Sequence, residues 1–161
     1  MSRSAIILVL VCITTLVGCD ASRVYETNIE LLDQLWIRDS LLYFDFEIAH
    51  IKEPYNLLAN IQYSSDFDYR NLYLTYALYD STGQELDKSL INAMLFSDKV
   101  GKPLGSSAIG DIYELQTPIL SAYKFEYRGK YRMTFQQYMR VDSLYKLTGV
   151  GLRVEKSTTE K

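Results

Sequence analysis

The chain has 161 residues, of which 48% are hydrophobic and 23% are charged, which suffices for one domain with a sizeable core and leaves little room for a second. Its formal net charge of −3 at pH 7 provides no basic surface, so the composition argues against a nucleic acid partner.

The N-terminal residues 1–18 have the features of an export signal, the first element of the chain. Arg3 lies near the start, an apolar stretch follows over residues 5–17, and Gly18 is a small residue at the end. A membrane-spanning helix needs about 20 apolar residues. The stretch is therefore too short to be a permanent transmembrane anchor, and we expect residues 1–18 to be a lipoprotein signal peptide.

Cys19 ends this signal in the sequence LVGC, residues 16–19, which matches the bacterial lipobox. In a lipobox the cysteine thiol takes a diacylglycerol, and the signal peptide is cut just before it. Cleavage would remove Cys12, so a disulfide between the two cysteines is excluded. Two or three acyl chains hold a protein stably on a bilayer, whereas one binds only marginally. We therefore expect Cys19 to carry the lipid, palmitate included, and the membrane to be a partner through it.

Residues 19–40 are expected to form a lipidated N-terminal linker. The stretch TNIELLDQLW, residues 27–36, suggests a loop or one short helix, through Ile29, Leu32 and either Leu35 or Trp36.

Residues 41–156 alternate between apolar and polar side chains in several stretches, which places the apolar ones on one face of a strand. The clearest strand is LLYFDFEI, residues 41–48, and Gly83 and Gly129 are expected at turns. Six to eight short strands without a long helical period predict an all-β antiparallel sandwich over 41–156, followed by a flexible tail at 157–161. Asn56, Asn60 and Gln62 are expected to point outward, and a further strand is expected at AYKFEY, residues 122–127. The residues expected to point inward are Leu42, Phe44, Phe46, Ile48, Tyr55, Leu57, Ala59, Ile61, Tyr63, Leu72, Leu74, Tyr76, Leu78, Tyr131, Met133, Phe135, Gln137, Met139, Val150, Leu152 and Val154.

Catalytic groups are scarce in the mature chain. Its one histidine, His50, follows a strand end, and its one cysteine is expected to be lipidated. This argues against thiol-histidine catalysis and against the usual zinc sites. The glycines of GSSAIGDI, residues 105–112, lack the Lys-Ser or Lys-Thr of a phosphate loop, and Ile109 breaks the hydrolase pattern around Ser107. We expect no enzyme, no catalytic residue, no metal and no cofactor.

The 14 tyrosines suggest an alternative function, because exposed aromatic rings can stack on sugars. The alternative is a surface glycan-binding β-sandwich module, which requires two or three exposed, coplanar rings. Structural use is the competing interpretation, since tyrosine packs its ring in strands while its hydroxyl stays in water. The candidate rings are Tyr43, Tyr73, Tyr79, Tyr113 and Tyr138.

Segments along almost the whole mature chain resemble the gliding-motility lipoprotein H (GldH) family of the Bacteroidota. They are CDASRVYE at residues 19–26, YNL at 55–57, RNLYL at 70–74, GKPLGSSAIGDIYE at 101–114 and QYMRVDSLYKLTGVGLRVEK at 137–156. Pro103 departs from the aromatic residue expected after Gly-Lys. The resemblance implies a non-enzymatic, lipid-anchored protein of the cell envelope, expected in the outer membrane. It also implies that other envelope proteins of the gliding apparatus and of type IX secretion are partners.

The stretch 99–114 holds glycines and a proline between predicted strands but also includes apolar residues. Long loops of this kind are often functional surfaces. Two interpretations stay open: a connection packed on the sandwich, or a partner-binding loop. The candidate partner surface consists of Lys102, Leu104, Gly105, Ile109, Gly110 and Asp111.

Overall fold

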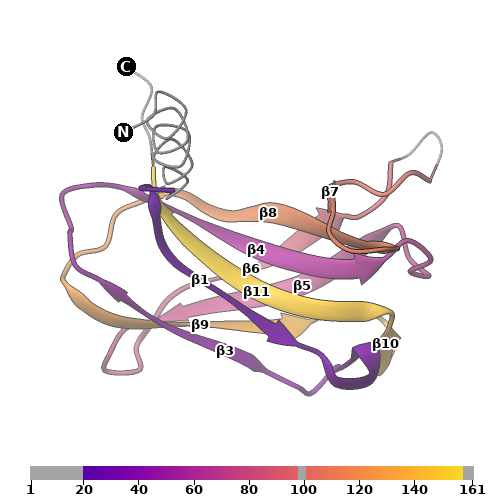
Figure 1. Ribbon diagram of the computed structural model, residues 1–161. Helices are drawn as coiled ribbons and strands as arrows, with labels where there is room; N and C mark the ends of the chain where they lie inside the picture. The colour runs from indigo at the N-terminus through magenta and orange to yellow at the C-terminus, as the bar shows by residue number, and fades with distance from the viewer. Residues whose placement is uncertain (1–19, 98–100, 158–161) are drawn as a thin grey trace, which may run out of the picture.

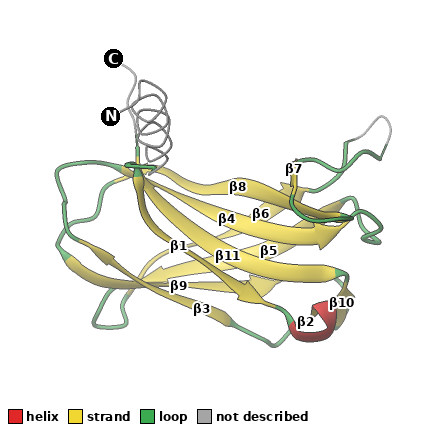
Figure 2. Ribbon diagram, viewed as in Figure 1, coloured by secondary structure: helices red, strands yellow, loops and turns green. Residues whose placement is uncertain are grey.

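The computed structural model describes residues 20–97 and 101–157, and these form two facing antiparallel sheets (Figures 1 and 2). The five-stranded sheet has the order β1 (Arg23–Glu30), β11 (Leu147–Lys156), β4 (Tyr55–Ser64), β8 (Ile112–Tyr123) and β7 (Ser106–Ser107). The four-stranded sheet has the order β3 (Leu42–Ile48), β9 (Gly129–Gln137), β5 (Asn71–Tyr79) and β6 (Glu85–Met94). A two-stranded sheet pairs β2 (Leu35–Ile37) with β10 (Ser143–Tyr145).

The predicted all-β antiparallel sandwich is confirmed, with eleven strands in the described residues instead of six to eight. The additional strands include β2, β7 and β10, which are two or three residues long. Such short strands have no measurable alternation, so the sequence pattern could not show them. The signal peptide and Cys19 lie outside the described residues, as does most of the tail.

The core between the sheets consists of the side chains that alternate inward along each strand. On β3, Leu42, Phe44, Phe46 and Ile48 are buried, and the intervening residues are exposed, as the sequence predicted. The inward residues predicted for β4, β5, β9 and β11 are buried as well. Met139 lies just past β9 and is only partly buried.

Residues 19–40 differ from the expected linker, because β1 pairs with β11 from Arg23 to Glu30. The side chains of β1 are exposed or half-buried on both faces of the strand, as is typical of an edge strand. The sequence of β1 therefore shows no clear two-residue period. The expected short helix is a single 3-10 turn, η1 (Leu32–Gln34), in which Asp33 and Gln34 have positive φ angles of 55° and 54°. The chain reverses there and does not continue as a helix.

One further expectation was wrong. The strand expected at residues 122–127 ends at Tyr123, and Phe125 is a buried residue of the following loop, 3% exposed. Asn60 lies on the face opposite Ala59 and Ile61, as predicted, but neighbouring side chains bury it there. Its amide donates to Glu26 and Asn28 on β1 across the glycine position 151 of β11. A Cβ at position 151 would lie 1.7 Å from Asn28 Oδ1, so only glycine leaves room for this polar contact.

Candidate functional site

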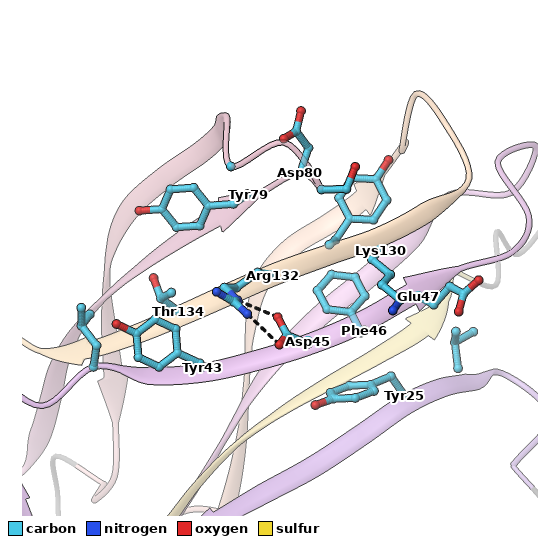
Figure 3. Close-up of a pocket in the computed structure, with 15 residues that line it drawn as sticks. Tyr25, Tyr43, Asp45, Phe46, Glu47, Tyr79, Asp80, Lys130, Arg132 and Thr134 are labelled. Atoms are coloured by element: carbon cyan, nitrogen blue, oxygen red, sulfur yellow. Dashed lines mark hydrogen bonds and ion pairs between the residues drawn. The ribbon is translucent and has the colours of Figure 1, made fainter.

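An open groove of about 1060 Å³ lies on the outer face of the four-stranded sheet and extends around its edge strand β3 (Figure 3). The register places Tyr43 opposite Thr134 and Asp45 opposite Arg132 on β3 and β9. On the other side of β9, Tyr79 of β5 is opposite Arg132. Three neighbouring strands therefore bring these side chains to one face.

Small side chains form the centre of this face. Thr134 is 7% exposed and Ala77, its partner on β5, is 5% exposed, although both point away from the core. The larger groups around them, including Tyr43 at 52% exposed, cover them from the sides. Small residues enclosed by large ones produce a hollow in an otherwise flat sheet.

Arg132 is the central charged group of the groove. Its Nε and Nη2 donate to the two carboxylate oxygens of Asp45 at 2.6 and 2.8 Å, and its guanidinium lies 5.6 Å from the centre of the Tyr43 ring. Hydrogen bonding from Arg132 lowers the pKa of Asp45. The bidentate geometry fixes the plane of the guanidinium against the aromatic ring.

Asp80 holds the β5–β6 turn at one end of the groove. Its carboxylate accepts hydrogen bonds from the backbone of Thr82 and Gln84 and from the hydroxyls of Thr82 and Tyr127. The Thr82 hydroxyl and then the Tyr127 hydroxyl lower the pKa of Asp80 to about 2. The predicted turn is confirmed, with Gly83 at a φ of 86°. The Asp80 carboxylate thus has a structural role, because four hydrogen bonds from the turn and from Tyr127 hold it in place.

The loop that follows β6 holds the predicted partner surface, and Figure 1 shows it protruding at the end of the sandwich where β7 lies. Its base is pinned to the core: the Leu104 amide donates to Leu95 O at 2.8 Å, and the Tyr63 hydroxyl donates to the carbonyls of Leu95 and Leu104. Gly105 has a φ of 99°, and a Cβ there would lie 2.3 Å from Glu114 O. Glycine is required at this crossing because the two backbones are so close.

Several side chains between β6 and β8 are exposed. Ile109 is 85% exposed, Leu104 is 37% exposed, and Lys102 and Asp111 are also at the surface. Gly110 adopts a φ of 62° in the turn that leads into β8. The structure thus combines a packed backbone with outward apolar side chains. Whether these residues bind a partner stays a prediction.

The opposite end of the sandwich holds Asp20, the residue that follows the expected lipidation site in the sequence. Asp20 forms an ion pair with Arg153 of β11 and accepts the Ser22 amide at 3.1 Å. The Ser22 carbonyl in turn accepts the Lys156 amide at 2.8 Å. Hydrogen bonds with Ser22 and Arg153 lower the pKa of Asp20 to about 2. The expected lipidation site is therefore adjacent to a residue that is tied to the sheet.

The sequence singled out one histidine of the mature chain, and the structure shows its position. His50 is exposed in the loop after β3. No group of three or more His, Cys, Asp or Glu side chains in residues 20–97 and 101–157 is placed to hold a metal ion. Within the same ranges, no helix has the length and apolar character needed to cross a membrane.

Four of the five candidate tyrosines share the outer face of the four-stranded sheet: Tyr43, Tyr73, Tyr79 and Tyr138. Tyr113 lies on the other sheet, where its ring packs 6.2 Å from that of Tyr63. The sequence placed Arg132 and Thr134 outward by alternation but could not place them beside Tyr43 and Tyr79. That information lies in the pairing of β3, β9 and β5.

The fold defines a class, namely an antiparallel β-sandwich domain. Residues 23–154 match the GldH lipoprotein family, and the chain belongs to this family. The resemblance seen in the sequence is confirmed.

Two similar proteins have descriptive names. The chain is 32% identical to the "Gliding motility lipoprotein GldH homolog" of Christiangramia forsetii, over 87% of this chain and 88% of that protein. It is 28% identical to the "Gliding motility lipoprotein GldH" of Flavobacterium johnsoniae, over 87% and 89%. Among solved structures, the VP2 subviral particle of infectious bursal disease virus aligns with 84% of this chain and 33% of its own, at a TM-score of 0.42 and 12% identity. A similarity that weak supports no functional argument.

Proposed function

We propose that this chain is a non-enzymatic envelope lipoprotein required for gliding motility, anchored in the outer membrane by acyl chains on Cys19. Membership of the GldH lipoprotein family over residues 23–154 is the observation that carries the proposal. The names of the two relatives point to gliding motility as the process, and each relative matches 87% of this chain.

Its role is that of an accessory or scaffolding component that contacts other envelope proteins of the gliding apparatus and of type IX secretion. The placement of the two ends supports this role. β1 begins three residues after Asp20 at one end of the sandwich, and the loop between β6 and β7, which includes Leu104, protrudes near the other (Figure 1). β8, with 12 residues, connects the two ends and spans roughly 40 Å at about 3.3 Å per residue. An anchored domain of this length can present the loop well away from the bilayer.

The test is a gene deletion complemented with the wild-type chain or with Cys19→Ser. We expect the deletion to stop gliding and to reduce export of surface adhesins, and the wild-type gene to restore both. Cys19→Ser should restore neither, because serine cannot form the thioether on which lipidation and cleavage depend. Labelling with a fatty acid analogue checks the anchor directly. Normal gliding in the deletion strain would overturn the proposal, and equal label in wild type and variant would remove the anchor from it.

A further inference from the structure

We infer that the groove on the outer face of the four-stranded sheet is a binding site for a neutral glycan. This inference goes beyond the proposed function, because a role in gliding requires no glycan. It rests on the shape of the groove, on two aromatic side chains and on the pairing of its charges.

The shape favours a small ligand with a flat face. Tyr43 and Tyr79 belong to β3 and β5, which flank β9, and Figure 3 shows both rings beside Arg132. Strands two apart in a sheet are separated by roughly 10 Å, and the two tyrosines lie in neighbouring rows, because Tyr43 is opposite Thr134 and Tyr79 is opposite Arg132. The space between the rings is wide enough for one pyranose ring, and its floor is formed by the buried Thr134 and by Arg132. The ligand can therefore sit above small side chains and contact an aromatic ring at its edge.

The charges select against an ionic ligand. Asp45 is neutralised by two hydrogen bonds from Arg132, and Glu47 is opposite Lys130 in the register. Asp80, the remaining acid of the groove, already accepts hydrogen bonds from Thr82, Gln84 and Tyr127. Of the three acidic side chains, Asp45 and Glu47 each lie opposite a basic one, so an anion would meet a carboxylate beside each basic group and a cation would meet a basic group beside these two acids.

The remaining chemistry fits hydroxyl groups. A guanidinium has five N–H donors, of which Asp45 uses two, and a carboxylate accepts more than two hydrogen bonds. Arg132 and Asp45 can thus donate to and accept from a vicinal diol without breaking their ion pair. An aromatic ring offers an apolar face to the C–H face of a sugar. Fixed polar groups beside exposed rings favour a neutral polyhydroxyl ligand over an apolar peptide.

The experiment uses the purified mature chain on a printed array of neutral and anionic oligosaccharides, followed by calorimetric titration of the strongest neutral binder. We expect binding that is unchanged when the salt concentration rises, because the ligand carries no charge. Tyr43→Ala and Tyr79→Ala should each weaken the affinity by at least about tenfold, whereas Tyr43→Phe should retain most of it.

Tyr138→Ala and Tyr145→Ala are matched controls, because these tyrosines are 65% and 58% exposed but do not line the groove. Circular dichroism confirms that each variant is folded, and Tyr43→Phe reports on the ring if Tyr43→Ala is unstable. Three results would overturn the inference: no glycan retained on the array, retention of anionic glycans alone with strong salt dependence, or wild-type affinity in both Tyr43→Ala and Tyr79→Ala. Loss of glycan binding in a strain that still glides would leave the proposed function intact.

Discussion

At the residue scale, Phe46 shows how the alternation along β3 separates core residues from surface residues. Its side chain is 4% exposed, and its ring lies 5.9 Å from Tyr25 and 6.0 Å from both Phe125 and Tyr131. Removing a ring of this kind leaves a cavity and costs about 3–5 kcal/mol. We expect Phe46→Ala to lower the free energy of unfolding by that amount in urea denaturation.

Tyr43→Ala, on the opposite face of the same strand, is the control. Tyr43 is 52% exposed and contacts Arg132, so we expect a loss of at most about 1 kcal/mol. Equal losses in the two variants would show that the strand register is misassigned.

Asp80, in the turn between β5 and β6, contributes to the loss of folding stability at low pH. Because the pKa of Asp80 is lowered to about 2 by the hydroxyls of Thr82 and Tyr127, its carboxylate is favoured in the folded state. The stability it contributes is complete above the unfolded pKa of about 3.9 and is lost as the pH falls through about 2. We expect Asp80→Asn to flatten the fall in unfolding free energy between about pH 4 and pH 2, measured by urea denaturation across this range.

Tyr127→Phe removes one of the donors to Asp80, at 2.7 Å, and should flatten the profile only in part. An Asp80→Asn profile parallel to that of the wild type at every pH would contradict the assignment.

At the scale of elements, the loop between β6 and β8 has a hydrogen-bonded backbone but exposed apolar side chains. Ile109 is 85% exposed and Leu104 is 37% exposed, while the Leu104 backbone is bonded to Leu95 and Tyr63. We expect Leu104→Asp with Ile109→Asp to abolish gliding with the melting temperature nearly unchanged, since surface changes usually cost under about 0.5 kcal/mol.

Leu32→Asp in η1 is the matched control, because Leu32 is 84% exposed at a different surface. It should leave gliding intact. If the double variant instead melts several degrees lower and is degraded in cells, the loop is a packed connection and the partner surface must be withdrawn. Ile109→Asp alone then shows whether its side chain has any role.

At the scale of the whole molecule, the ion pair between Asp20 and Arg153 ties the first described residue to β11. Arg153 has a side chain that is only 14% exposed, and it also pairs with Glu26 and Glu155. Consecutive Cα atoms are 3.8 Å apart, so a lipid on Cys19 is at most one residue from this cluster. We therefore predict that the proposed lipid on Cys19 restricts the orientation of the domain on the bilayer.

Inserting ten Gly and Ser residues between Cys19 and Asp20 should release this restriction, since such a linker spans roughly 17 Å on average. We expect a fluorophore at position 109 to lose residual anisotropy on vesicles in the inserted variant. The same insertion after Ser157 is the control and should leave the anisotropy unchanged. Identical anisotropy with and without the N-terminal insertion would contradict the rigid attachment.

The sequence by itself determined the class of the protein and much of its interior. The lipobox at Cys19 and the family segments predicted a GldH-type lipoprotein, and alternation placed Phe44, Phe46 and Ile48 in the core. These features are local: a strand with one buried face must alternate with a period of two, whichever strands it pairs with.

Only the tertiary structure decided which outward residues meet. Tyr43, Thr134 and Tyr79 are far apart in the chain, and the order β3-β9-β5 brings them together. The edge strand β1 was missed because its half-exposed faces carry no clear period. The burial of Asn60 on the outward face could not be predicted, because it depends on the contact with Asn28 across the glycine at 151. Strand pairing is set by the fit of whole sheets, and the pattern of any single segment does not contain it.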